Sequence, residues 1–132
     1  MAPLAKLPIF LDLHGRRVVV VGSSAGVAWK AELLAAAGAE VELFAQDEPH
    51  EQILRLAAGA VGPGRVAVRR CPLRPDALEG AAIAVMDAAN EAEACRLHAA
   101  ARAAGVPANV IDKPAFCDLQ FGAIVNLSLI HI

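Results

Sequence analysis

The 132-residue sequence is poor in aromatic residues and close to neutral. Only 4% of its residues are aromatic although 57% are hydrophobic, so we expect a core of small aliphatic side chains that packs helices closely against a sheet. The formal net charge is −2, with both signs interspersed. A nucleic-acid partner would require a strongly basic face, so this charge balance argues against one. The length and the mean hydropathy of +0.49 predict one domain with a single sizeable core.

Cysteine is also scarce. The three cysteines, Cys71, Cys95 and Cys117, are far apart and form no C-x-x-C pair. Neither a disulfide framework nor a thiolate metal cage is therefore indicated, and the histidines show no metal-ligand spacing either. We expect no metal site in the chain, and a reducing cytoplasm as its location.

No segment resembles an export signal or a membrane span. Residues 1–13 carry Lys6, Pro8 and Asp12 and lack the continuous apolar stretch of a secretory signal. The longest uncharged stretch, 18–29, is interrupted by glycine and serine and falls far short of the roughly 20 apolar residues that span a bilayer. The sequence therefore predicts a protein without a membrane partner.

Strand-like and helix-like patterns alternate along the chain. Strands are predicted at 18–21, 41–45, 66–68, 82–86 and 108–111, and helices at 25–37, 49–58 and 91–104, two of them ended by glycine. Such alternation predicts an α/β fold, a Rossmann-like three-layer domain with a mostly parallel sheet. A ligand crevice is then expected at the carboxyl ends of the strands, which are followed by Gly22, Gln46, Asp87 and Asp112.

The turn after the first predicted strand is a candidate phosphate site. Gly22, Ser23, Ser24, Ala25 and Gly26 lie between a buried strand and a helix start, where free N–H groups and the helix dipole favour a pyrophosphate. The G-x-G-x-x-G pattern is imperfect, because serine stands at the second glycine and the last glycine comes one residue early. On this feature alone, a tight turn that opens a helix capped by Ser23 or Ser24 is as well supported as a ligand site.

Two acidic residues follow neighbouring strands. Asp47 lies about 20 residues beyond Gly26, where a carboxylate binds the adenosine ribose in NAD-selective sites. It could equally be a solvated loop residue or the N-cap of the next helix. Asp87 could line the crevice or cap the following helix, and the cap is slightly favoured.

A third carboxylate, Asp112, ends the last predicted strand within N-V-I-D-K-P at 109–114. Surrounding apolar side chains would partly desolvate it and suit it to proton transfer. For an isolated Asp-Lys-Pro, a turn residue that bonds its own loop is the more common case.

Other polar and aromatic side chains carry weaker signals. The arginines near the end of the third strand could meet substrate carboxylates, but a solvated basic face is favoured. Trp29 is interpreted as a packing residue rather than a cofactor contact. The arginines are Arg69, Arg70 and Arg74.

Five sequence blocks together resemble the amino-terminal domain of siroheme synthase. They are L-P-I-F at 7–10, the strand 18–21 with its glycine, K-A-E-L-L at 30–34, A-A-G-A at 36–39 and N-V-I-D at 109–112. With Cys117 and G-A-I-V at 122–125, the resemblance covers residues 4–126.

The resemblance implies a function and a site. The family oxidises precorrin-2 to sirohydrochlorin with NAD and then inserts Fe²⁺ to give siroheme, so a tetrapyrrole would be the substrate. NAD would lie over residues 22–26 and reach Gln46 and Asp47, with Asp87 as a further candidate contact. Asp112 matches the family's essential aspartate and would act as general base beside the nicotinamide.

The sequence departs from the family at several points. The family commonly has three glycines where this chain has Gly22-Ser23-Ser24, and Thr-Asp-Asp where it has Met86-Asp87-Ala88. It also continues with a dimerisation region, so we expect residues 1–126 to be an incomplete domain of a homodimeric enzyme.

The tail 127–132 can be back-translated as CTG TCT CTT ATA CAC ATC, which resembles a sequencing-library adapter, and we expect it to be non-native. The alternatives to a precorrin-2 dehydrogenase domain are a non-catalytic NAD-binding module and an inactive fragment of the enzyme.

Overall fold

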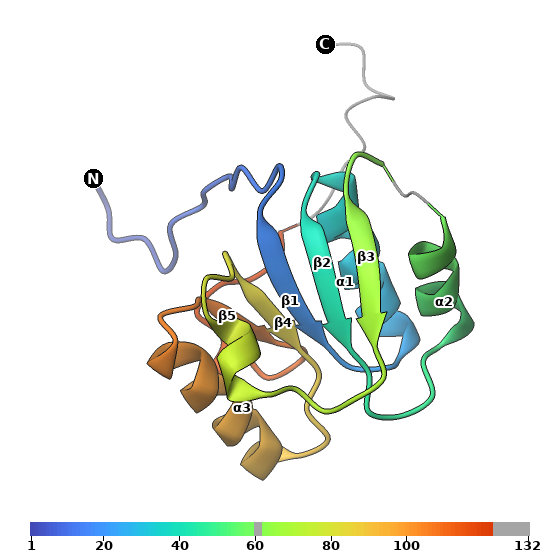
Figure 1. Cartoon of the computed structure of the whole chain (residues 1–132). Helices are drawn as coiled ribbons and strands as arrows, with labels where there is room; N and C mark the ends of the chain where they lie inside the picture. Colours follow the sequence, from blue (N-terminus) through green and yellow to red (C-terminus); the bar gives the residue numbers. More distant parts are fainter. Residues whose placement is uncertain (60–61, 123–132) are drawn as a thin grey trace.

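The computed structural model describes residues 1–59 and 62–122, and Figure 1 shows its arrangement. The expected tail 127–132 and most of the block 122–125 lie outside the described residues. The elements in chain order are β1 (Arg17–Val21), α1 (Ala25–Ala36), β2 (Glu40–Phe44), α2 (Glu51–Ala58), β3 (Arg65–Arg69), η1 (Pro75–Leu78), β4 (Ala84–Met86), α3 (Glu91–Ala103), β5 (Ala108–Val110) and η2 (Pro114–Phe116).

The five strands form one sheet in the order β3-β2-β1-β4-β5, and all four pairings are parallel. The chain runs outward from β1 to β3 and then returns to the other side of β1 with β4. This reversal leaves a crevice beyond the carboxyl ends of β1 and β4, where α/β folds of this kind bind ligands. The predicted α/β class is confirmed, and each predicted strand is present within two residues of its expected bounds.

Helices cover both faces of the sheet, which gives three layers (Figure 1). One apolar cluster joins α1 and α2 to the sheet, and a second joins α3 and η1 to the opposite face. Val18 and Val20 belong to the first cluster and Val19 to the second, and all three are fully buried. The central strand is therefore apolar on both sides, as its continuous valine run predicts.

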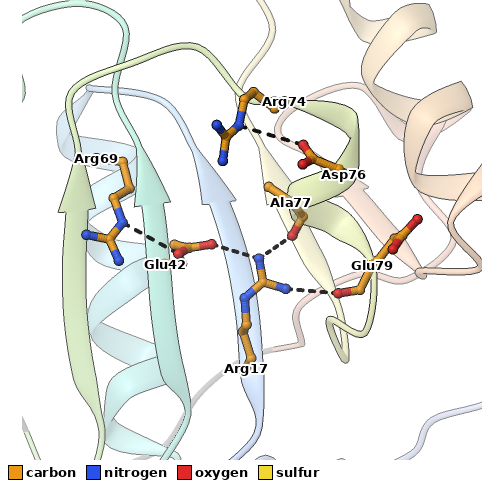
Figure 2. Close-up of polar contacts among 7 residues, drawn as sticks. All are labelled: Arg17, Glu42, Arg69, Arg74, Asp76, Ala77 and Glu79. Atoms are coloured by element: carbon orange, nitrogen blue, oxygen red, sulfur yellow. Dashed lines mark hydrogen bonds and ion pairs between the residues drawn. The ribbon is translucent and has the colours of Figure 1, made fainter.

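On the second face, charged side chains of β1, β2 and β3 form a cluster of polar contacts (Figure 2). Arg17 donates to the carboxylate of Glu42 at 2.7 Å and to the backbone carbonyls of Ala77 and Glu79 in and after η1. Arg69 also pairs with Glu42, at 3.5 Å. The cluster ties three neighbouring strands to the segment that leads into β4.

The arginines singled out in the sequence are exposed, as interpreted, and each has a carboxylate partner. Arg70 pairs with Glu48 at 2.7 Å. Arg74 pairs with Asp76 at 3.7 Å, as Figure 2 shows. The expected solvated basic face is thus neutralised side chain by side chain.

One prediction on the first helix was wrong: Trp29 was expected to pack, but 53% of its surface is exposed on the outer side of α1. The helix predicted at 49–58 begins two residues later, at Glu51, after the cap His50, whose Nδ1 accepts the N–H of Gln52 at 3.1 Å. Across the described residues, every helix is too short or too polar to cross a bilayer.

Candidate functional site

A hollow of about 510 Å³ lies at the point where the strand order reverses, between the ends of β1, β2 and β4. This volume is within the range of small-molecule sites. All the residues predicted to bind a cofactor line it except Ala25 and Gly26, which are exposed in the first turn of α1. The lining residues from that set are Gly22, Ser23, Ser24, Gln46, Asp47 and Asp87.

Gly22 makes the sharp turn from β1 into α1. Its φ is +140°, and an added Cβ would lie 2.5 Å from Cγ2 of Val27 and 3.0 Å from Cβ of Asp87. The backbone hydrogen bonds between neighbouring strands continue past the strand ends. The N–H of Gly22 donates to the carbonyl of Phe44 at 2.9 Å, and the N–H of Asp87 donates to the carbonyl of Val21 at 2.8 Å. Only glycine fits this position, so the start of α1 is held against the end of β4.

The serines after this glycine organise the loop. Ser24 is the N-cap of α1, and its Oγ accepts the N–H of Val27 at 3.2 Å. The N–H groups of Ala25 and Gly26, at the start of a 12-residue helix, have no helical acceptor, and N–H groups in this position of a helix are able to bind phosphate oxygens. Ser23 ties the turn to the loop after β2, since its Oγ donates to the carbonyl of Asp47 at 3.2 Å and its carbonyl accepts the N–H of His50 at 2.7 Å.

The charges in the hollow are negative. Its lining contains the carboxylates of Asp47, Asp87 and Glu93 and no arginine or lysine. A bound pyrophosphate would therefore depend on backbone N–H groups and the α1 dipole rather than on a cationic side chain. The same carboxylates suit the hydroxyl groups of an unphosphorylated ribose and oppose a 2′-phosphate.

Two capping alternatives for these aspartates were wrong. The N-cap of α3 is Asn90, whose Oδ1 accepts the N–H of Glu93 at 2.8 Å, and Asp87 instead accepts the Ser24 hydroxyl at 3.5 Å. Asp47 does not cap α2 either, because His50 does. Both carboxylates line the hollow, which for Asp87 is the less favoured of the two placements expected from the sequence.

Asp112 lies in a second, smaller hollow of about 240 Å³ that shares no lining residue with the first. The hollow is formed mainly by β5 and the chain after it, together with Lys30, whose Nζ lies 4.1 Å from the centre of the Phe121 ring. Asp112 is exposed, so the expected desolvation by apolar neighbours is not found among the described residues. Its backbone has a left-handed φ of 59°.

Several residues of the two hollows were not predicted as site residues. Glu93, which lines the first hollow, is one of them, and the N-x-x-E spacing from the cap Asn90 could have placed it in the first turn of α3. Asn109 and Cys117 line the same hollow as Asp112, and the side-chain hydrogen bonds between them and from Cys117 to the carbonyl of Val110 have no local sequence pattern.

This combination of a parallel sheet, a glycine turn into a helix and carboxylates after neighbouring strands defines a dinucleotide-binding α/β domain. The chain belongs to the family described as "Putative NAD(P)-binding", whose model matches residues 9–123.

Relatives with the name siroheme synthase match most of this chain, which confirms the resemblance seen in the sequence. The protein from Ectopseudomonas mendocina is 37% identical over 122 residues, which are 92% of this chain and 25% of the relative. Siroheme synthase 1 of Halorhodospira halophila is 40% identical over 110 residues, or 82% of this chain and 22% of the relative. The chain therefore spans about a quarter of the length of these curated relatives.

A solved structure with a similar fold is SirC, precorrin-2 dehydrogenase. It superposes with a TM-score of 0.66 over 89% of this chain and 55% of that chain. At 19% sequence identity, this similarity concerns the fold.

Proposed function

We propose that this chain is the nucleotide-binding part of an enzyme that oxidises precorrin-2 to sirohydrochlorin with NAD. The observation that carries the proposal is the glycine turn at the β1–β4 crevice, combined with relatives that are siroheme synthases. Bound NAD would supply the hydride acceptor, and the protein would supply binding, orientation and a base.

The first hollow is the proposed NAD site. The free N–H groups at Ser24, Ala25 and Gly26 would bind the pyrophosphate, and Asp47 would accept hydrogen bonds from the adenosine ribose. Gln46, at the same strand end, would contact the same half of the cofactor. Asp87 stands beside the turn, so we expect it to orient the cofactor rather than to react.

Asp112 is the proposed general base. The ends of β4 and β5 are adjacent, since Ile111 donates to Met86 at 2.9 Å. We propose that a tetrapyrrole macrocycle lies across the two strand ends, with the carbon that loses hydride toward the first hollow and the departing proton toward Asp112. An exposed carboxylate at a rigid strand end is available for that contact.

Insertion of Fe²⁺ into sirohydrochlorin, homodimer formation and a cytoplasmic location are finer parts of the proposal that rest on the family resemblance. Among residues 1–59 and 62–122, no three His, Cys, Asp or Glu side chains are grouped to hold a metal ion. In this proposal Fe²⁺ is a substrate that enters the pyrrole nitrogens, and Asp112 receives the protons that these nitrogens lose.

The test is anaerobic turnover of precorrin-2 with NAD, followed through NADH absorbance and the spectrum of sirohydrochlorin. It is run on this chain and on the chain extended by downstream coding sequence from the same locus. Asp112→Asn should lower kcat by about 100-fold or more, because it removes the base and keeps the side-chain shape. Asp76→Asn, which alters an exposed carboxylate on η1, is the matched control and should leave turnover unchanged.

The main alternative is a non-catalytic NAD-binding module. It is favoured if both forms bind NAD and neither forms sirohydrochlorin. An Asp112→Asn variant that retains full turnover would remove Asp112 from the mechanism and leave the NAD site unaffected.

A further inference from the structure

Asp112 is, within the described chain, the one non-glycine residue with a positive φ. An aspartate tolerates this left-handed conformation better than most residues, but it still costs free energy and persists only where neighbouring contacts enforce it. The turn is closed by one backbone hydrogen bond from Lys113 to Val110 at 3.1 Å. Further contacts must therefore hold the backbone of this turn in place.

The thiol of Cys117 supplies such contacts. Its Sγ lies 3.2 Å from the carbonyl oxygen of Val110 and 3.4 Å from that of Lys113. These are the residues two positions before and one position after Asp112, so one sulfur atom bridges the two arms of its turn. The cysteine itself is placed by η2, where its N–H donates to Pro114 at 3.2 Å.

The position of Cys117 is itself fixed by Asn109. Asn109 is 8% exposed, and its Nδ2 donates to the carbonyl of Leu119 at 3.0 Å and to Sγ of Cys117 at 3.5 Å. Backbone and carboxylate contacts between Ala108 and Asp118, at 2.7 and 3.0 Å, fasten the same returning segment to β5. The side-chain amide of Asn109 thus links β5, the strand that Asp112 follows, to the segment that carries Cys117.

We propose that Asn109 and Cys117 are positioning residues that hold Asp112 in its left-handed turn and aim its carboxylate into the second hollow. The catalytic consequence rests on the proposed function, in which Asp112 is the general base. Because a misplacement of about 1 Å can cost a factor of about 100 in rate, loss of these contacts should lower turnover without changing the NAD site.

The first experiment measures the conformation and does not need activity. In this chain labelled with ¹⁵N, Cys117→Ala and Asn109→Ala should each shift the backbone amide signals of residues 111–113 and leave those of residues 22–26 in place. Cys117→Ser, whose hydroxyl can donate to the same carbonyls, should restore part of the change. Cys95→Ala, at an exposed cysteine on α3, is the matched control and should alter neither group of signals. Unchanged signals at 111–113 in both alanine variants would overturn the proposal.

The second experiment measures the catalytic consequence in the form of the protein that turns over. Cys117→Ala should lower kcat about 10-fold or more, with the KM for NAD changed less than about twofold, and Cys117→Ser should recover part of kcat. In an Asp112→Asn background, Cys117→Ala should cause no additional loss, because both changes act on the same group.

The outcomes separate this inference from the function on which it rests. Equal losses from Cys117→Ala in both backgrounds, or a kcat within twofold of the parent, would overturn the positioning role. If no form oxidises precorrin-2, the proposed function fails, and the amide signals still decide whether Asn109 and Cys117 hold the turn.

Discussion

Replacing Gly22 by alanine is a perturbation whose cost follows closely from the structure. The new methyl group would lie 2.5 Å from Cγ2 of Val27 and 3.0 Å from Cβ of Asp87. Val27 is fully buried and β-branched, so it cannot rotate away easily. Crowding of this kind costs about 1–3 kcal/mol, and a strained positive φ adds about 1–3 kcal/mol. We expect Gly22→Ala to lower the free energy of unfolding by about 4 kcal/mol.

Two further variants separate the contributions. Gly105 has a φ of +72° and no atom within 4 Å of an added Cβ, so Gly105→Ala should cost about 1 kcal/mol of conformational strain alone. Gly26 has no positive φ, and its nearest neighbour is Oγ of Ser24 at 3.8 Å, so Gly26→Ala should not lower stability. Urea unfolding followed by far-UV circular dichroism gives all three values. A loss at Gly22 no larger than that at Gly105 would refute the close packing of the turn.

Three other predictions concern the caps, the polar cluster and the phosphate turn. Ser24→Gly should raise the affinity for NAD several-fold in calorimetric titrations, because it opens the backbone to the pyrophosphate and costs only a few tenths of a kcal/mol as a cap; weaker binding would mean that the hydroxyl aids the cofactor. Arg17→Ala should cost about 2 kcal/mol in urea unfolding, since two carbonyls lose their donor and Glu42 keeps only its longer contact with Arg69, whereas Arg65→Ala, with a side chain 80% exposed, should cost less than about 0.5 kcal/mol. Asn90→Ala should cost about 1 kcal/mol by removing the α3 cap, and a similar loss in Asp87→Ala would contradict the assignment of that cap.

Much of the fold was predictable because its signals are local. The valine run at 18–21 has no polar position, as expected for a strand covered on both faces, and the structure buries both sides of it. Gly38 and Gly105 both have left-handed φ values, which explains why helices end just before them. The crevice then followed from the order of strands and helices alone.

Two predictions failed for different reasons. The cap of α3 was misassigned because two nearby residues are both suitable caps, and Trp29 was misplaced because its side of the helix depends on its spacing from buried residues. Asp87 and Asn90 are both good N-cap residues, and only the glutamate three positions after Asn90 distinguishes them. Trp29 lies two residues after the buried Val27, a rotation of about 200° that puts it on the outer side of the helix. This exposure could have been predicted from the spacing.

The surroundings of Asp112 could not be predicted in this way. Its turn depends on hydrogen bonds from Asn109 and Cys117 to backbone groups up to ten residues away, and hydrophobic periodicity carries no information on such contacts. The position of Asp112 after a strand was evident from the sequence, but its left-handed backbone and its separate hollow became evident only from the structure.

Binding of NAD at the crevice between β1 and β4 is measurable in this chain alone. In an NMR titration of the ¹⁵N-labelled chain with NAD, each amide reports its own surroundings. We expect saturable shifts at residues 22–26, 46–47 and 87, with a Kd below about 1 mM, and binding of NADP at least about 10-fold weaker because Asp47 opposes a 2′-phosphate. If the amides of the folded chain at these positions do not respond to NAD, the crevice is not an NAD site, and equally tight binding of NADP would remove the proposed role of Asp47.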